Sequence, residues 1–190
     1  DYELGWIVSI CQGKGNGRKV TEVLCSLETK IYATARVENT TMRSILELYG
    51  LKQTGRLKNN KIVVPSLSWH TDLSSPMILG MEPLLCDCNL ENLSCDLEHL
   101  ESLFKTHNPA ALILVSVLGL VPDMKSIVDL CKKYDVLLIE DVCESAGSRY
   151  NNQLLGSFGL VSLFSFYYGH HLSTIEGGFI NTSDKELSNV

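Results

Sequence analysis

Two segments of the sequence carry side chains that could move protons at a bound ligand. The first is residues 165–178, which contain the histidine pair His170 and His171 and end in Glu-Gly-Gly. An imidazole titrates near neutral pH, so a histidine in a polar loop suits general acid–base catalysis. The alternative is a structural histidine in a turn before a glycine-rich strand, and we assign that role to His171.

The second segment is the acidic pair Glu140-Asp141, which follows the apolar run Val136–Ile139. The run predicts a strand that ends at Ile139, and ligands of parallel sheets bind beyond the carboxyl ends of strands. A carboxylate at this point can reach a ligand. An acidic pair after a strand can also cap a helix or lie in a solvated turn, and position alone leaves these interpretations open.

The elements that must position these residues follow from the periodicity of the chain. Apolar, β-branched runs predict strands, and the amphipathic stretches between them predict helices. The helix at 123–134 is the clearest, because Pro122-Asp123 begins it and a lysine pair suits its C-terminal dipole. The predicted strands are 62–64, 84–86, 111–115 and 136–139, and the other predicted helices are 18–29, 41–52, 71–79 and 96–106. This order predicts an α/β fold with a mostly parallel sheet that is covered on both faces.

Composition excludes some classes of function. The chain has 190 residues, of which 45% are hydrophobic and 20% charged, so it can bury one substantial core. Its net charge of -6 gives no basic surface, which argues against a nucleic-acid partner. No apolar stretch approaches the roughly 18 residues of a membrane span, so we expect a soluble, cytoplasmic protein.

The cysteines predict reduced thiols and no metal site. There are 7 of them, an odd number, and most lie in apolar runs. Cys86 and Cys88, with Cys95 nearby, could in principle contribute to a metal site. We favour a buried strand instead, because alternate strand residues point to opposite faces and no further ligand completes the spacing.

A resemblance to a known family joins these segments. The chain resembles the DegT/DnrJ/StrS sugar aminotransferase family from about residue 30 to residue 190, in four segments that occur in the family's order. The segments are Val63–Trp69, Ile139–Gly147, Gly156–Gly159 and Phe164–Gly178. The resemblance implies the three-layer α/β/α large domain of fold-type I pyridoxal-phosphate enzymes. We expect residues 1–190 to form a single, partial domain of this type, with residues 1–30 not assignable and the C-terminal small domain missing.

The resemblance also implies a reaction. His170 stands where the family's cofactor lysine belongs, and an imidazole has no primary amine with which to hold pyridoxal 5'-phosphate covalently. This exchange resembles the branch that dehydrates nucleotide-linked 4-keto-6-deoxysugars at carbon 3 for polysaccharide or lipopolysaccharide synthesis. The cofactor would act as pyridoxamine 5'-phosphate, formed with L-glutamate as amino donor. His170 would remove a proton from the cofactor methylene and help to protonate the departing 3-hydroxyl.

The resemblance assigns the contacts of the cofactor ring. Asp141 would pair with the pyridine nitrogen and keep it protonated, and Trp69 would stack on the ring face. The alternative for Trp69 is an ordinary core or surface tryptophan after a strand. Glu144 occupies a position near the ring in relatives, and a helix cap or a surface position fits it equally well.

The phosphate contacts are implied in the same way. Ser165 would donate its hydroxyl, and Thr41 with the backbone N–H of Met42 would complete the site at the start of a helix. The turn before Thr41 departs from the family pattern, because Glu38 places an anion near the phosphate.

Two other classes of function remain open. One is a sugar aminotransferase relative that transaminates carbon 3 or 4, and the other is a non-catalytic, truncated homologue. The resemblance further implies a homodimer in the full-length form.

Overall fold

The computed structural model describes residues 2–3, 31–32 and 59–185. The predicted helices at 18–29 and 41–52 lie outside these residues, as do Thr41 and Met42, so the predicted contacts of that pair with a phosphate stay predictions.

The chain divides into two units, Asp1–Arg56 with Val190 and Leu57–Asn189. In the first unit, β1 (Tyr2–Glu3) pairs in parallel with β2 (Ile31–Tyr32). The expectation of a single partial domain over residues 1–190 stays a prediction.

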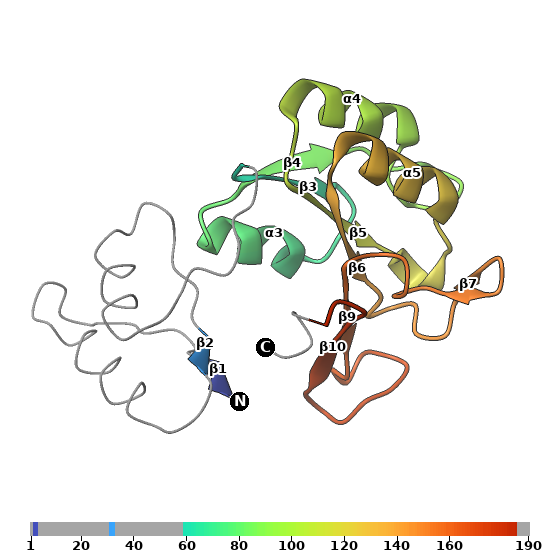
Figure 1. Ribbon diagram of the computed structural model, residues 1–190. Coiled ribbons are helices and arrows are strands. Elements are labelled where there is room, and N and C mark those ends of the chain that lie inside the picture. Colours follow the sequence, from blue (N-terminus) through green and yellow to red (C-terminus); the bar gives the residue numbers. More distant parts are fainter. Residues whose placement is uncertain (1, 4–30, 33–58, 186–190) are drawn as a thin grey trace, which may run out of the picture. The chain divides into compact units, whose positions relative to one another are not determined.

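The second unit is built on a six-stranded sheet with the order β10-β9-β6-β5-β3-β4 (Figure 1). Neighbouring strands run parallel except β10, which pairs antiparallel with β9. The large strands are β3 (Lys61–Pro65), β4 (Glu82–Cys86), β5 (Ala111–Val115), β6 (Leu137–Asp141), β9 (Val161–Ser165) and β10 (Gly178–Thr182). A separate small hairpin consists of β7 (Arg149–Tyr150) and β8 (Gln153–Leu154). The mostly parallel sheet predicted from the apolar runs is confirmed.

Helices cover both faces of this sheet. Figure 1 shows α4 and α5 on one side and α3 on the other. The helices are α3 (His70–Ile78), α4 (Leu97–His107) and α5 (Met124–Tyr134), and a short 3-10 turn, η1 (Val117–Gly119), follows β5. The predictions at 71–79, 96–106 and 123–134 are therefore confirmed, with ends that differ by about one residue. The arrangement is the expected three-layer α/β/α architecture.

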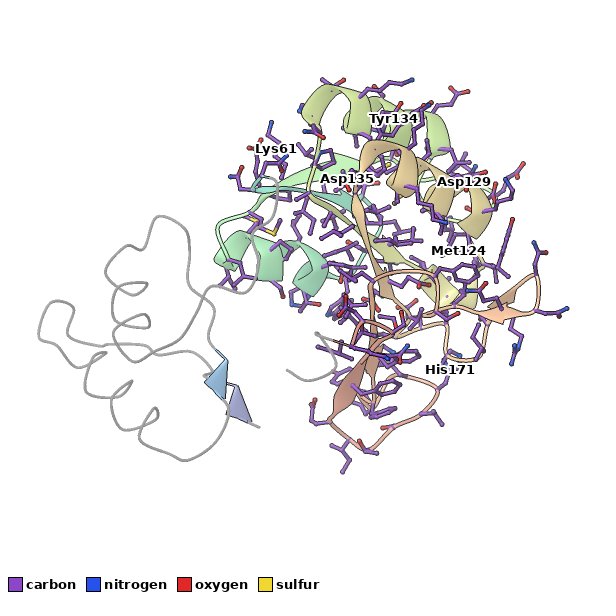
Figure 2. The ribbon with its side chains drawn as sticks, viewed as in Figure 1. Lys61, Met124, Asp129, Tyr134, Asp135 and His171 are labelled. Carbon is purple, nitrogen blue, oxygen red and sulfur yellow. The ribbon has the colours of Figure 1, made fainter. Side chains whose placement is uncertain are left out.

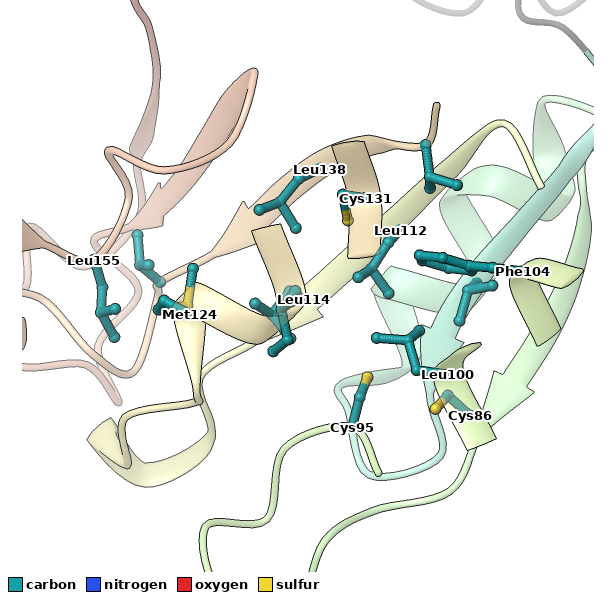
Figure 3. Packing of buried hydrophobic residues seen from close by; sticks show 14 residues of the cluster. Cys86, Cys95, Leu100, Phe104, Leu112, Leu114, Met124, Cys131, Leu138 and Leu155 are labelled. Atoms are coloured by element: carbon teal, nitrogen blue, oxygen red, sulfur yellow. The ribbon is translucent and has the colours of Figure 1, made fainter. Parts of the chain in front are cut away.

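The core reflects the alternation of side chains along buried strands. On one face, Leu112 and Leu114 of β5 pack with Leu100 and Phe104 of α4 and with Met124 of α5 (Figure 3). The intervening residues of β3 and β5 form a second cluster on the opposite face. That cluster consists of Ile62, Val64, Ala111, Ile113 and Val115. A strand that is buried on both faces is apolar at every position, which is why 111–115 was predicted correctly.

The N-terminus of α5 is held by Asp123, as the sequence predicted. The backbone N–H of Ser126 donates to Asp123 Oδ1 at 3.3 Å, and the Ser126 hydroxyl donates to Oδ2 at 2.6 Å. The Tyr150 hydroxyl also donates to Oδ1 at 3.0 Å. These bonds, led by that from the Ser126 hydroxyl, lower the pKa of Asp123.

Replacement of Asp123 by alanine is expected to lower the free energy of unfolding by about 1–2 kcal/mol, because an N-cap and a side-chain hydrogen bond are lost together. Urea denaturation measures this. Asp123→Asn keeps an N-cap acceptor and serves as the control, which should lose only a fraction of that amount. An alanine variant as stable as the parent chain would show that the cap contributes nothing.

Candidate functional site

The predicted site residues that the structure describes lie at or beyond the carboxyl ends of neighbouring strands. Trp69 follows β3, Asp141 ends β6, Glu144 follows it, and Ser165 ends β9. Because β3, β5, β6 and β9 are parallel, these ends lie at one edge of the sheet. The loop of residues 166–177, which carries His170, leaves from the same edge and returns as β10. This is the edge at which open α/β sheets bind ligands.

Asp141 is the last residue of strand β6 and does not lie in a loop. It pairs with Val115 of β5 and Leu163 of β9, so β6 extends two residues beyond the predicted end at Ile139. The sequence-based boundary was wrong because a polar residue can end a strand that pairs on both sides. The backbone N–H of Cys143 donates to Asp141 Oδ1 at 2.9 Å, and this bond helps to orient the carboxylate.

A second carboxylate, not foreseen from the sequence, faces Asp141. Asp72 lies in the first turn of α3 and is 6% exposed. Burial, followed by the charge of Asp141 and a hydrogen bond with it, raises the pKa of Asp72 from 3.8 to about 7. Burial likewise raises the pKa of the nearby Cys143 thiol, with further contributions from Asp141 and Asp72. No local pattern joins positions 72 and 141, because the chain brings them together only through the sheet.

Trp69 is a surface residue at the start of α3. Its side chain is 64% exposed. The centroids of the Trp69 and His70 rings lie 5.2 Å apart, and the ring planes are tilted by 50°. A core position is therefore excluded. Stacking of Trp69 on a cofactor ring stays a prediction, with an aromatic surface available for it.

Ser165 ends β9 opposite Gly178 of β10. The backbone N–H of Tyr167 donates to Ser165 Oγ at 3.2 Å, and this bond occupies a lone pair of the hydroxyl. The hydroxyl hydrogen can still be donated to an anion. The Ser165 hydroxyl is therefore available for the predicted contact with a phosphate.

His170 lies in a closed loop. The backbone N–H of Phe166 donates to the Gly177 carbonyl at 2.8 Å, and that of Thr174 donates to the Phe166 carbonyl at 3.0 Å. Within the loop the His170 backbone N–H donates to the Tyr167 carbonyl at 3.0 Å, and the two rings lie edge to face with centroids 6.1 Å apart. His170 is half-buried, whereas the adjacent His171 is exposed. Figure 2 shows His171 on the loop between β9 and β10. Backbone bonds fix the turn, so the His170 imidazole is not needed to hold it.

The side chain of Glu144, in the segment after β6, bridges to the segment after β5. Its Oε2 accepts the backbone N–H of Leu118 at 2.6 Å, and Leu118 has a φ of 55°. A non-glycine residue in the left-handed region is uncommon, and this bond helps to hold it there. The structure thus gives Glu144 a loop-bridging contact, while its predicted place near a cofactor ring stays a prediction.

Glu140, the other member of the acidic pair, points into the protein and is 2% exposed. Its Oε2 accepts the backbone N–H of Gly156 at 2.7 Å, and its Oε1 accepts those of Phe158 and Gly159, each at 2.7 Å. A Cβ at Gly159 would lie 2.6 Å from the Leu138 carbonyl oxygen, so glycine is needed there. The Gly-Ser-Phe-Gly segment is therefore a loop wrapped around a buried carboxylate, and Glu140 does not face the ligand-binding edge.

Two of the three cysteines that prompted a metal hypothesis belong to the core. Cys86 and Cys95 are buried with Leu100 (Figure 3), and a hydrogen bond with Cys86, followed by burial, raises the pKa of the Cys95 thiol well above its ordinary value. Cys88 is half-buried and pairs with Cys95 across an isolated bridge. Within residues 2–3, 31–32 and 59–185, no three His, Cys, Asp or Glu side chains are grouped as a metal site requires. In the same part of the chain, no helix has the length and apolar character needed to cross a membrane.

Comparison with known proteins defines the class. Residues 18–190 match the model of the DegT/DnrJ/EryC1/StrS aminotransferase family, and the chain belongs to this family. It is 34% identical over 146 residues to GDP-4-keto-6-deoxy-D-mannose 3-dehydratase of Escherichia coli O55:H7, an alignment that covers 77% of this chain and 37% of the relative. It is 30% identical over 182 residues to GDP-perosamine synthase of Escherichia coli O157:H7, covering 96% of this chain and 48% of that relative.

Solved structures agree with this assignment. The E. coli GDP-4-keto-6-deoxy-D-mannose 3-dehydratase with bound hydrated PLP superimposes with a TM-score of 0.64 at 31% identity, over 78% of this chain and 38% of that one. Another structure of a GDP-4-keto-6-deoxymannose 3-dehydratase holds a trapped PLP-glutamate geminal diamine and matches with a TM-score of 0.63 at 32% identity. The chain thus spans less than half the length of these relatives.

Proposed function

We propose that this chain is part of a pyridoxamine-phosphate-dependent 3-dehydratase that acts on a nucleotide-linked 4-keto-6-deoxysugar. The observation that carries the proposal is His170. By the family resemblance it stands where the cofactor lysine belongs, and the structure places it on a loop that leaves the sheet edge at which Asp141 ends β6. The dehydratase relatives support a GDP-linked sugar as substrate and L-glutamate as amino donor.

The described residues fit a pyridine cofactor. Asp141 offers a carboxylate, held by the Cys143 N–H, for a ring nitrogen; Trp69 offers an exposed aromatic face, and Ser165 a hydroxyl for a phosphate. When bound, the cofactor supplies an amine for the 4-keto carbon and an electron-accepting ring. Asp141 would keep the ring nitrogen protonated. His170 would take a proton from the carbon next to the cofactor amine and would deliver one to the leaving 3-hydroxyl oxygen.

Further features of the whole protein belong to this proposal. The family resemblance implies a homodimer in the full-length form that serves the synthesis of a polysaccharide sugar, and the sequence itself suggests a cytoplasmic location. The aminotransferase alternative is kept because the perosamine synthase relative matches 96% of the chain. Transamination requires a lysine that holds the cofactor. The histidine at position 170 therefore argues against the aminotransferase alternative.

A borohydride experiment separates the two chemistries. The purified chain is incubated with pyridoxal 5'-phosphate, reduced, and analysed by peptide mass spectrometry. We expect no covalent label near residue 170 in the parent chain, a label in His170→Lys, and none in the matched control His171→Lys. Labelling of a native lysine at the site, in a cofactor-dependent manner, would support the aminotransferase alternative.

The catalytic role of His170 has its own test. His170→Asn is expected to lower the rate of glutamate-dependent 3-dehydration by roughly 100- to 10,000-fold, the usual contribution of a general acid–base residue, while pyridoxamine phosphate still binds. The matched variant His171→Asn should retain activity. Equal activity of His170→Asn and the parent chain would remove His170 from the mechanism.

A further inference from the structure

The carboxyl group of Asp72 is buried, and one of its oxygens lacks a hydrogen-bond partner. Asp72 is 6% exposed, three residues beyond Trp69, and its backbone N–H donates to the Trp69 carbonyl at 3.0 Å. Its carboxyl Oδ2 is buried, and no donor among the described residues reaches it. A buried carboxylate oxygen without a donor is costly, so something must compensate.

The groups that face this carboxyl are themselves acidic. The carboxyl of Asp141, at the end of β6, is near enough to raise the pKa of Asp72 through its charge, and the Cys143 thiol in the loop beyond is itself influenced by both carboxyls. Two ionised carboxylates only accept hydrogen bonds, so neither could satisfy the other. When one of them holds a proton, a single O–H donor removes both the repulsion and the unpaired atom.

We propose that Asp72 is a positioning residue that holds a proton up to about neutral pH and then donates its O–H to the carboxylate of Asp141, so that the protonated pair carries a single negative charge. The proton sits on Asp72 because burial disfavours its ionised form. The start of α3 opposes this, since a helix N-terminus favours an ionised acid, but burial and the charge of Asp141 act in the other direction and outweigh it.

The Asp72–Asp141 pair would also affect how the cofactor binds, and this part of the inference rests on the proposed function. The Cys143 N–H and the Asp72 O–H would together fix the plane of the Asp141 carboxylate. A single negative charge in that plane matches a single ring N–H⁺, whereas two charges would leave one uncompensated after the ring binds.

Infrared spectroscopy of the whole 190-residue chain, without cofactor, tests the shared proton. The parent chain is expected to show a protonated-carboxyl band that titrates with a midpoint near the pKa of Asp72, about 7. The band should be absent in Asp72→Asn and retained in the control Asp129→Asn, which removes an exposed carboxylate. A parent chain without this band, or a band unchanged in Asp72→Asn, overturns the proposal.

The pH dependence of stability gives a second readout. Asp72 has an unfolded pKa of 3.8 and a folded pKa of about 7, so between these values the folded chain binds the extra proton. The contribution of Asp72 to stability is therefore full below the unfolded value and falls as pH rises through the folded one. Asp72→Asn, whose amide can still donate to Asp141, should lose this downward slope. An unchanged slope in Asp72→Asn counts against the proposal.

Binding of pyridoxamine phosphate separates this proposal from the function. We expect Asp72→Asn to bind it within about 3-fold of the parent chain and Asp72→Leu, which has no donor, to bind it at least about 10-fold more weakly. Equal affinity of Asp72→Leu and the parent overturns the positioning role. Failure of the parent chain itself to bind contradicts the proposed function, while the infrared band and the stability slope still decide whether the pair exists.

Discussion

Replacement of Glu140 by alanine is expected to destabilise the protein by about 3–5 kcal/mol, because it leaves several buried backbone donors unsatisfied at a cost of about 1–3 kcal/mol each. The carboxylate accepts three backbone N–H groups, from Gly156, Phe158 and Gly159. Alanine would leave all of these donors without their acceptor. Since a domain of this size has a total stability of about 5–15 kcal/mol, the alanine variant will be marginal.

Glu140→Gln is a milder replacement, so its effect on stability can be measured even if the alanine variant does not fold. Its amide oxygen can replace Oε1, but its NH2 group meets the Gly156 N–H, so a donor faces a donor. We expect a loss of about 1.5–3 kcal/mol, the value of a hydrogen bond to a charged group. Urea denaturation would show a lower midpoint with an unchanged slope. The exposed Glu98→Gln is the matched control and should change stability by less than about 0.5 kcal/mol. A Glu140→Gln variant as stable as this control would show that the buried carboxylate is not what holds the loop.

Asp141→Asn is expected to weaken the binding of pyridoxamine phosphate by roughly 10- to 150-fold, which corresponds to the loss of a charge-assisted hydrogen bond. The fold should survive, because the amide oxygen of asparagine can still accept the Cys143 N–H. The rate of dehydration should fall further than the affinity, because the ring nitrogen would no longer be kept protonated.

An absorbance titration of the cofactor and an activity assay at saturating cofactor measure the two effects separately. The control is Asp129→Asn, which removes a carboxylate of an exposed ion pair on α5 and should change neither. Unchanged affinity and rate in Asp141→Asn would remove Asp141 from the cofactor site.

The fold was predictable where local pattern and tertiary environment agree. The strand at 111–115 is buried on both faces and shows it as a continuous apolar run. Helix α5 begins directly after Asp123, the residue that caps it. The antiparallel pairing of β10 was not foreseen, because the direction of a strand after a loop depends on how the loop closes.

The site was only partly predictable. Glu140 and Asp141 are adjacent, so on a strand they must face opposite sides, and this alternation was a signal that could have separated the buried residue from the available one. Asp72 gave no such signal, since an acidic residue in the first turn of a helix ordinarily serves the helix dipole. Its proposed role depends on proximity to Asp141, which is distant in sequence and is brought near only by the folded sheet.

The closure of the 166–177 loop has an evolutionary consequence. Its base is fastened by main-chain bonds between Phe166, Thr174 and Gly177, and none of these bonds involves the side chain at position 170. Under the proposed function, the side chain that would set the reaction can therefore be exchanged without altering these bonds. If the proposed function holds, exchange of one residue on an unchanged loop would replace the lysine of amino transfer with the imidazole of dehydration.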